Sequence, residues 1–492
     1  MLRTKERIFQ WDPVLGRLEA GVVDALRFSR IENPKRFDYV KSALDGDRSR
    51  VDRRVCAANI LTITRGVQML TTRSWALGGV LLVCGVVPYA YAQDVITMWV
   101  HSGPGSEREA YVASIKAFNE SQTIYKAELI TQPEGQYENR VEEAAKSNQL
   151  PCVLDFDGPF VYNYIATKKI VPLDDIPDSV ALGVDMLPSL LRQGTYKKQL
   201  YSVGQYDSGL AIWANRKLLN SAGVRIPVRL TEAWSLSEFE EVLRKLKDSG
   251  VPYPLDMKFN YGLGEWMTYG ISPIVQSMGG DLINRNGFVS AQGAINGPAA
   301  VAALTAVQRW VKAGYVNPTP KGDDDFIKGR SALSYVGHWT YREYKKALGN
   351  DLVLIPMPRF GHRQVTGAGS WNFGISANCQ NRRGAAKLLT HLMKPEEITR
   401  VTAINGAIPG TFTALMRNHA FDYGGPLHIY YQQLSEGVAE VRPETAAYPA
   451  ITAAFSRAVG RIVYGADVKR SLDTAAQTID RYIAQNPSGT EQ

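Results

Sequence analysis

Cysteine is scarce in this sequence, at 4 of 492 residues. So low a content excludes the small secreted scaffolds that disulfides hold together. Charged residues make up 21% of the chain and hydrophobic residues 45%, as in an average soluble globular protein. The composition thus excludes a disordered chain, a fibre and a protein with many membrane spans. The length corresponds to about three domains, or to two large lobes with an appendage.

Sequence motifs of several enzyme classes are missing as well. From residue 93 onward the chain contains no HExxH, GxxxxGK[ST], GxSxG or CxxC sequence. Its six histidines lack the spacing of metal ligands, and the acidic run 323–325 is typical of a solvated loop. Asp155 and Asp157 share one face of a predicted strand and could act as a carboxylate pair, but hydrogen bonding at the strand end is favoured. We therefore predict no enzyme, no metal and no cofactor.

Basic residues are concentrated at the beginning of the chain. Residues 1–92 carry a net charge of +6, whereas residues 93–492 carry only +2. The larger part also lacks a basic run that could follow a phosphate backbone. The overall charge of +8 therefore does not indicate a nucleic-acid partner.

A hydrophobic run, residues 75–87, is too short to span a membrane comfortably. Arg73 precedes this run, and the Ala-Tyr-Ala sequence 90–92 follows it. A basic residue, a short apolar stretch and an Ala-x-Ala site predict a secretory signal peptide that is cleaved after Ala92.

The position of this signal is unusual, because signal peptides begin near the N-terminus. Met69 lies just ahead of the apolar run, so we interpret 69–92 as the signal peptide and 1–68 as an over-extended start. A cytoplasmic module followed by an anchor is the alternative for 1–68. Val83 is not the small residue that a lipoprotein requires before Cys84, which favours a soluble product in the periplasm.

Predicted strands and helices alternate from residue 93 onward. The βαβαβ order indicates a doubly wound α/β domain with a largely parallel sheet. Ligands bind such sheets at the loops that follow the strands, here 102–106, 132–135 and 157–159. The elements behind this prediction are the strands 94–100, 125–131 and 152–156 and the helices 107–120 and 137–147.

The stretch 200–213 is long, strand-like and interrupted by glycine, which suits a crossing between two lobes. Ser235 or Ser237 is expected to cap a helix that follows this crossing. The further elements that we predict are the strands 332–336, 352–357 and 370–376 and the helices 236–249, 297–313, 383–393 and 448–484.

Three tryptophans in predicted loops, Trp266, Trp339 and Trp371, each lie beside glycine or polar residues. The nearby stretch 205–208 adds Gln, Tyr, Asp and Ser. Sugars offer an apolar ring face and a rim of hydroxyls, which an aromatic plate and side-chain acceptors match. The pattern indicates a sugar site, and core packing is the alternative for each tryptophan.

Seven short stretches follow one another in a specific order along residues 93–480. They are 150–159, 171–174, 215–223, Trp234 to Phe239, 279–281, 329–333 and 405–409. In this order and spacing, behind a signal peptide, they resemble the family 1 extracellular solute-binding proteins of sugar ABC importers, the group of the maltose-binding protein. Cys152 is the main departure, because family members have a small residue plus Asp after Leu-Pro.

The resemblance implies a type II periplasmic-binding-protein fold, with two α/β lobes joined by a hinge and a mainly parallel sheet flanked by helices in each. Lobe 1 would hold 93–205 and 368–410, and lobe 2 would hold 206–367 and 411–492. The implied function is capture of a sugar in the cleft between the lobes by hinge closure. The sugar-loaded protein, expected to be a monomer, would then meet the permease of an ABC importer at the inner membrane.

The resemblance also implies which residues face the cleft, by their position after strands or at the crossing. The implied ligand contacts are Ser102, Gly103, Ser106, Glu134, Asp157, Tyr206, Asp207, Glu265, Trp266, His338, Trp339, Ser370, Trp371 and Asn372.

Cys152 and Cys379 are the only cysteines that remain after cleavage, and export would place them in an oxidising compartment. In the family, the strand after the return crossing runs antiparallel beside the third strand, which would bring these residues together. The resemblance therefore implies a disulfide, and two separate buried thiols are the alternative.

Two other classes of function stay open. A glycerophosphodiester would require arginine or helix N-termini in the cleft, and a polyamine would require several acidic residues. An exported enzyme on the same α/β framework would require a nucleophile–base pair, which is not visible in the sequence. The tryptophans favour a sugar.

Overall fold

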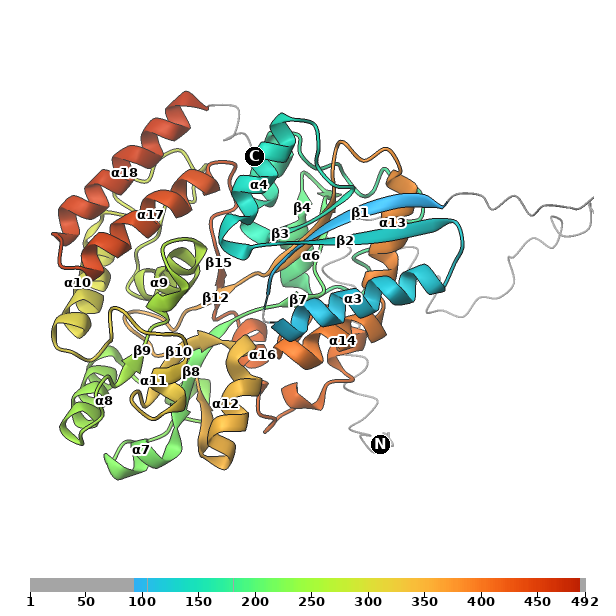
Figure 1. The fold of residues 1–492 in the computed structure, drawn as a ribbon. Coiled ribbons are helices and arrows are strands. Elements are labelled where there is room, and N and C mark those ends of the chain that lie inside the picture. Colours follow the sequence, from blue (N-terminus) through green and yellow to red (C-terminus); the bar gives the residue numbers. More distant parts are fainter. Residues whose placement is uncertain (1–92, 104, 180, 487–492) are drawn as a thin grey trace, which may run out of the picture. The chain divides into compact units, whose positions relative to one another are not determined.

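The computed structural model describes residues 93–103, 105–179 and 181–486. The predicted signal peptide, its cleavage site and the stretch 1–68 lie outside the described residues. A compact unit begins at Asp94 and is built on two main sheets (Figure 1). In the described ranges, no helix is both long enough and apolar enough to cross a membrane.

Lobe 1 is the part built on the five-stranded sheet β2-β1-β3-β13-β6. The parallel pairs β1–β2 and β1–β3 confirm the predicted βαβαβ order. Alternate residues of β1, Ile96, Met98 and Val100, are completely buried, as the period of a strand in a covered sheet requires. The strands are β1 (Asp94–His101), β2 (Tyr125–Gln132), β3 (Val153–Asp157), β6 (Ser202–Val203) and β13 (Trp371–Ile375).

Helices cover both faces of this sheet (Figure 1). On one face, Phe118 of α3 and Leu389 of α13 join the apolar residues of β1. On the other face, Val141 of α4 and Tyr164 of α5 pack against β3. The helices of lobe 1 are α3 (Gly105–Glu120), α4 (Tyr137–Lys146), α5 (Val161–Ala166), α6 (Pro188–Gly194), α13 (Arg382–Leu392) and α14 (Pro395–Asn405), with the 3-10 turns η2 (Glu134–Gln136) and η3 (Gly158–Phe160).

Lobe 2 is the part built on the four-stranded sheet β11-β8-β10-β9. Trp213, Trp234 and Trp310 are fully buried in its core. Its strands are β8 (Leu210–Asn215), β9 (Leu255–Asp256), β10 (Leu333–Gly337) and β11 (Leu352–Ile355). Its helices are α7 (Arg216–Ser221), α8 (Leu236–Asp248), α9 (Glu265–Ser277), α10 (Pro298–Lys312), α11 (Asp324–Ile327), α12 (Tyr341–Leu348), α15 (Phe412–Leu415), α16 (His428–Ser435), α17 (Tyr448–Val463) and α18 (Val468–Gln485).

All strands but one share a direction in each main sheet. β13 runs antiparallel to β3 and β6, and β8 runs antiparallel to β10 and β11. Each exception is the strand that the chain forms directly after it passes from one lobe to the other. The expected two-lobed α/β fold is therefore confirmed. The sheet of lobe 2 differs from the mainly parallel sheet that we expected, because β10–β9 is its parallel pair and the pairs of β8 with β10 and β11 are antiparallel. The passages between lobes account for the reversed strands.

The chain passes between the sheets at short strand pairs. It leaves lobe 1 after β6 and enters lobe 2 at β8, within the predicted crossing 200–213. It returns through Gly369, whose φ of 88° and close approach to the Gln193 side chain both require glycine. The pairs are β7 (Tyr206–Asp207) with β14 (Ile408–Pro409) and β12 (Thr366–Ala368) with β15 (Ala439–Val441). The residue limits given above for the two lobes stay predictions.

A disulfide joins Cys152 and Cys379, whose Cα atoms are 4.4 Å apart. The antiparallel pairing of β13 with β3 sets Ile375 opposite Val153, next to the two cysteines. The bond therefore ties the start of β3 to the segment that follows β13.

Local signals place several helix ends. The Ser235 side chain caps α8 by accepting a hydrogen bond from the Glu238 backbone N–H at 3.2 Å, as expected. The predicted helix 448–484 is instead divided into α17 and α18. Gly465 adopts a φ of 96° after α17, and the Asp467 side chain caps the start of α18.

Candidate functional site

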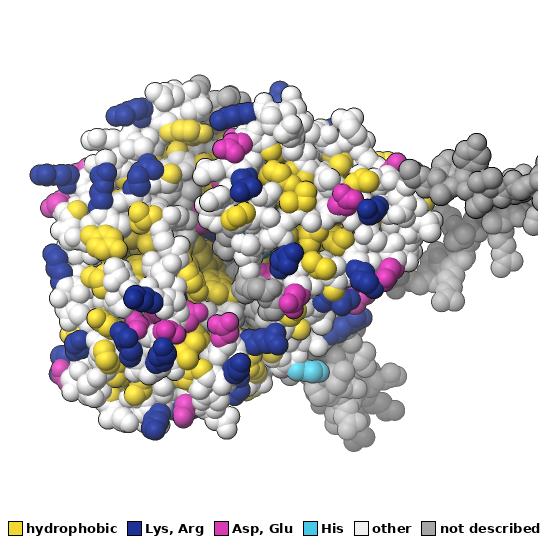
Figure 2. Space-filling view, in the orientation of Figure 1, with side chains coloured by type: hydrophobic (Ala, Val, Ile, Leu, Met, Phe, Trp, Pro, Cys, Tyr) yellow, Lys and Arg dark blue, Asp and Glu magenta, His cyan; other side chains and the backbone are white. Residues whose placement is uncertain are grey.

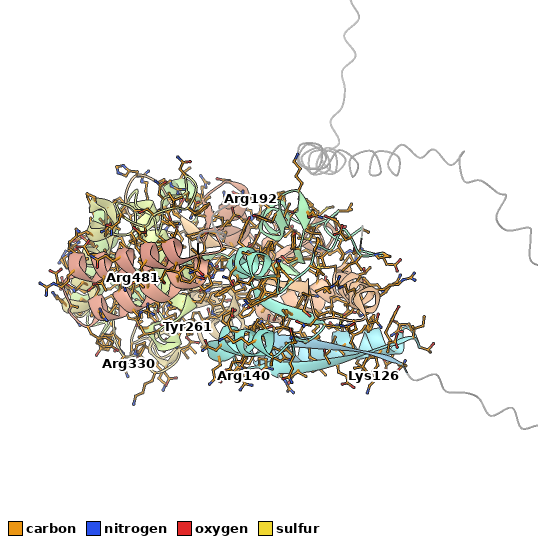
Figure 3. All side chains as sticks on the ribbon, turned by 90° about the horizontal axis from the view of Figure 1, so that it is seen from above. Lys126, Arg140, Arg192, Tyr261, Arg330 and Arg481 are labelled. Carbon is orange, nitrogen blue, oxygen red and sulfur yellow. A yellow bond between two sulfur atoms is a disulfide. The ribbon has the colours of Figure 1, made fainter. Side chains whose placement is uncertain are left out.

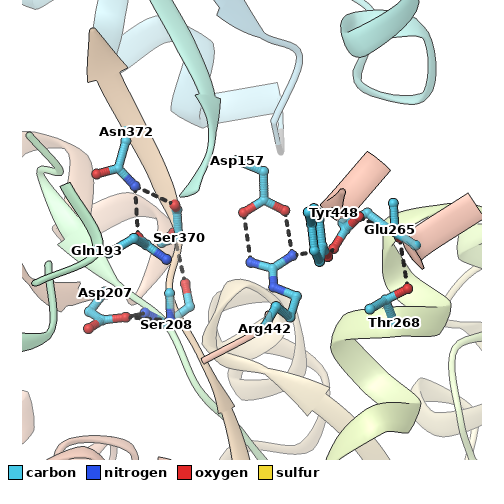
Figure 4. A network of polar contacts seen from close by, with 12 residues as sticks. Asp157, Gln193, Asp207, Ser208, Glu265, Thr268, Ser370, Asn372, Arg442 and Tyr448 are labelled. Carbon is cyan, nitrogen blue, oxygen red and sulfur yellow. Dashed lines mark hydrogen bonds and ion pairs between the residues drawn. The ribbon is translucent and has the colours of Figure 1, made fainter. Parts of the chain in front are cut away.

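An arginine holds two carboxylates where the lobes meet (Figure 4). Arg442, just after β15, donates to both Asp157 carboxylate oxygens at 2.6 and 2.7 Å and to Glu265 Oε1 at 2.6 Å. Asp157 ends β3 of lobe 1, and Glu265 begins α9 of lobe 2. We call these three residues the carboxylate–arginine group. Arg442 is 4% exposed, but Asp157 and Glu265 are 12% and 27% exposed, so the two carboxylate side chains, and not the guanidinium, form its accessible side.

Further residues of α17 hold the Glu265 carboxylate in place. The Tyr448 hydroxyl donates to Oε1, and the Thr452 hydroxyl donates to Oε2 at 2.7 Å. Burial raises the pKa of Glu265, against the opposing positive charge of Arg442. The orientation of this acceptor is therefore fixed before any ligand arrives.

Glu138 of α4 belongs to the same electrostatic surroundings. It accepts a hydrogen bond from the Tyr164 hydroxyl at 2.5 Å. Burial raises the pKa of Glu138 to about 8, and the negative charges of Asp157 and Glu265 add to the rise. At neutral pH this side chain is mostly protonated, so it can both donate and accept a hydrogen bond.

An aromatic cluster from lobe 2, consisting of Tyr261, Trp266, Tyr269 and Trp339, adjoins the carboxylate–arginine group. Neighbouring rings in the cluster have centroids 5.1–6.4 Å apart. The Arg442 guanidinium lies 4.8 Å from the centroid of the Tyr269 ring. Tyr261 lies near the junction of the lobes in Figure 3, and Figure 2 shows a hollow between the lobes with hydrophobic side chains on its walls.

A second polar region joins the outgoing and returning crossings. Asp207 Oδ1 accepts hydrogen bonds from the backbone N–H groups of Ser208 at 2.7 Å and Gly369 at 3.0 Å. Burial raises the pKa of this carboxyl. The hydroxyls of Ser208 and Ser370 lie 3.0 Å apart. We call Asp207, Ser208, His338, Ser370 and Asn372 the crossing network.

His338 completes one end of the crossing network. Its Nδ1 lies 2.8 Å from the Asn405 carbonyl oxygen and must carry the proton, so Nε2 accepts from the Ser208 hydroxyl at 2.9 Å. Burial lowers the pKa of His338 to about 4, so the ring is neutral at physiological pH. Its two ring nitrogens are thus both used within the protein.

Asn372 completes the other end of the crossing network (Figure 4). Its amide donates to Gln193 Oε1 and to the Ser370 carbonyl, both at 2.8 Å. The Ser202 hydroxyl contacts its Oδ1 at 3.3 Å. Since all five residues of the network are at most 6% exposed, these bonds hold strands together rather than face solvent.

Sequence comparison assigns this two-lobed architecture to a family. The sequence profile of the bacterial extracellular solute-binding proteins matches residues 113–416. The chain belongs to this family.

Solved structures with the same fold include binding proteins for different solutes. The GacH receptor of Streptomyces glaucescens, solved with acarbose, has a TM-score of 0.69 at 19% identity, over 80% of this chain and 98% of that one. UgpB from Mycobacterium tuberculosis, solved with glycerophosphocholine, has a TM-score of 0.69 at 17% identity, over 80% and 100%. The cyclic alpha-maltosyl-1,6-maltose binding protein from Arthrobacter globiformis has a TM-score of 0.64 at 22% identity, over 80% and 100%.

Lobe 1 of this solute-binding protein contains a buried histidine beside one predicted tryptophan. His101 Nδ1 lies 2.5 Å from Asp155 Oδ2, and its Nε2 lies 3.7 Å from Glu107 Oε2. Burial alone would lower the pKa of His101, but Asp155 and Glu107 outweigh it and hold the pKa well above 6.5. The imidazole stacks on Trp371 with ring centroids 3.6 Å apart, which fixes the orientation of the indole. The Tyr206 hydroxyl donates to Glu107 Oε1 at 2.9 Å.

Most of the predicted contacts of the solute-binding protein fall into four surroundings. Asp157 and Glu265 are in the carboxylate–arginine group, and Trp266 and Trp339 are in the aromatic cluster. The crossing network contains Asp207, His338, Ser370 and Asn372. Tyr206 and Trp371 lie beside the buried His101 and its partner Glu107 in lobe 1.

The remaining predicted contacts follow β1 and β2. Ser102 is exposed, and Gly103 lies so close to Glu107 that a side chain there would clash. The side chains of Ser106 and Glu134 lie outside the described residues. In the described part of the chain, no cluster of His, Cys, Asp and Glu has the arrangement of a metal site.

The sequence did not indicate Arg442, Glu138, Tyr261 or Tyr269. Arg442 follows a three-residue strand, and its partners Asp157 and Glu265 lie 285 and 177 positions away. Glu138 begins a helix, where an acidic residue has an ordinary explanation in the helix dipole.

Proposed function

We propose that this extracellular solute-binding protein captures a sugar between its lobes and delivers it to the permease of an ABC importer. The observation that carries the proposal is the partly exposed acceptor pair, Asp157 and Glu265, beside an aromatic cluster. Carboxylates accept hydrogen bonds from sugar hydroxyls, and indole faces pack against the apolar face of a sugar ring. Two of the structurally similar proteins were described with oligosaccharide-like ligands, acarbose and cyclic maltosyl-maltose.

Within this proposal, Asp157, Glu265, Trp266 and Trp339 contact the sugar directly, and Ser102, Gly103, Ser106 and Glu134 remain further candidate contacts. The crossing network, Tyr206 and Trp371 shape the site. Sugar contacts with both lobes are available only when the lobes close, so the ligand shifts the equilibrium toward closure. The protein acts in the periplasm as a monomer, after removal of the signal peptide at Ala92, and without turnover of its ligand.

Thermal unfolding and calorimetric titration against mono-, di- and oligosaccharides test this function. A sugar that binds raises the melting temperature in proportion to the logarithm of its concentration above the Kd. The expected result is stabilisation by at least one neutral saccharide, with no change in the saccharide on incubation. Stabilisation only by a phosphate ester or an amine would contradict the proposal.

A glycerophosphodiester with a choline group is the second candidate. Aromatic faces next to carboxylates also attract a quaternary ammonium, and UgpB with this fold was solved with glycerophosphocholine. Glycerophosphocholine therefore belongs in the same titration panel, where its binding in place of every sugar would favour this candidate.

A further inference from the structure

The accessible side of the carboxylate–arginine group consists of the two carboxylate side chains. Arg442 is almost fully enclosed, whereas the carboxylates that it holds are 12% and 27% exposed. Three of its N–H bonds are already directed at these carboxylates. A ligand that reaches this group therefore meets the carboxylate side chains before it meets the guanidinium.

The group also carries an excess of negative charge. One guanidinium stands against two carboxylates, and in the described residues neither carboxylate pairs with a second Lys or Arg. A ligand with a carboxylate or phosphate at this position would bring further negative charge, and it could reach Arg442 only by displacing Asp157 or Glu265.

We propose, resting on the sugar-binding function above, that Arg442 determines specificity: because Asp157 and Glu265 neutralise its charge, the site selects uncharged sugars and excludes their uronate and phosphate derivatives. Hydroxyls of an uncharged sugar donate to the exposed carboxylate edges, and the bonds from Arg442 keep these edges in place. An anionic derivative loses such bonds and gains repulsion. The preference for uncharged sugars therefore arises although the site contains an arginine, because two carboxylates neutralise it.

Removing the two carboxylate charges should make the site favour anionic ligands. In the double variant D157N/E265Q both side chains keep their shape and one acceptor oxygen each, but Arg442 is no longer neutralised. Its guanidinium then becomes the dominant charge of the site and attracts anions. The matched control is E440Q, which removes a carboxylate two residues from Arg442 that pairs instead with Arg285 and Arg363.

Calorimetric titration with matched pairs tests the inference: glucose and glucuronate, trehalose and trehalose 6-phosphate, and maltose and maltose 1-phosphate. Thermal unfolding of each variant shows whether it is folded. The natural protein and E440Q are expected to bind the uncharged member at least tenfold more tightly than its anionic partner. In D157N/E265Q the preference for the uncharged sugar is expected to shrink below about threefold or to reverse. Loss of one charge interaction typically changes affinity by about threefold.

Equal or tighter binding of the anionic member by the natural protein would overturn the inference and leave the sugar-binding function intact. An unchanged tenfold preference in folded D157N/E265Q would also overturn it, because another part of the site would then exclude anions. Binding of none of the six saccharides, with binding of glycerophosphocholine, would overturn the proposed function itself and this inference with it.

Discussion

The crossing network and the carboxylate–arginine group use the same kinds of side chain for different tasks. In the crossing network, Asp207 is completely buried and accepts bonds from two backbone N–H groups of neighbouring crossings. In the carboxylate–arginine group, Asp157 and Glu265 are held from behind by Arg442 and stay partly exposed. Residue type and loop position therefore do not separate a structural acceptor from a ligand-facing one. The two kinds of acceptor differ in the side from which protein donors reach them.

Replacement of Asp207 should give the largest effect on stability. D207A leaves the buried N–H groups of Ser208 and Gly369 without their acceptor. We expect the free energy of unfolding to fall by about 3 kcal/mol, from about 1–3 kcal/mol for each unpaired buried group. Urea unfolding measures the change. D207N keeps an acceptor oxygen and should lose less than half as much, and equal losses would contradict this role.

Acid should weaken the crossing network through His338. The pKa of this residue is about 4 in the folded protein and near 6.5 in the unfolded chain, so the unfolded state binds more protons in between. The free energy of unfolding should therefore decrease as the pH falls from about 6.5 to 4. The decrease should reach about 3 kcal/mol, at about 1.36 kcal/mol per pH unit. Above pH 6.5, His338 should contribute no pH dependence.

The H338Q variant isolates this contribution. Its unfolding free energy at pH 7 and at pH 4.5, measured in urea, should differ less than that of the natural protein. The same pH dependence in both proteins would show that His338 is not held neutral by burial.

Replacement of Trp339 should mainly affect binding. This tryptophan is half-buried in the aromatic cluster and contacts Tyr261 through its indole N–H at 3.0 Å. W339A should weaken sugar binding by about tenfold, or about 1.4 kcal/mol, because an aromatic ring face is lost. W339F retains a ring and should lose no more than about half of that energy. Calorimetric titration of both variants checks the difference, and unaltered affinity in W339A would place the sugar elsewhere.

Replacement of Ser370 should give the smallest effect. S370A removes the hydroxyl that lies 3.0 Å from Ser208, but it leaves the backbone of β13 in place. We expect a loss of about 1 kcal/mol in the free energy of unfolding and less than a twofold change in sugar affinity. A large loss of affinity with unchanged stability would move Ser370 from the crossing network to the ligand-facing group.

Much of the fold followed from periodic patterns and local signals in the sequence. The apolar run of β1, the amphipathic α3 and the capping serine of α8 are short-range features, and the structure confirms each of them. The interruption between α17 and α18 was missed, although Gly465 and Asp467 are local signals for a helix end and a helix start.

The candidate site was less predictable, because its bonds join distant parts of the chain. Asp207 and Gly369 are 162 positions apart, and Asp157 and Arg442 are 285 apart. Loop position predicted residues near the junction of the lobes, but their burial and bonding partners are set only by packing. The pairing of Arg442 with both carboxylates has no periodic or local signature in the sequence.

A crystal structure of the protein with the saccharide that binds most tightly in the titration panel tests the central claim most directly. We expect sugar hydroxyls within hydrogen-bond distance of the Asp157 and Glu265 carboxylates and a ring packed against Trp339, with the crossing network unchanged. A sugar that contacts neither carboxylate, or that takes its hydrogen bonds from Asp207 and Asn372 instead, would contradict it.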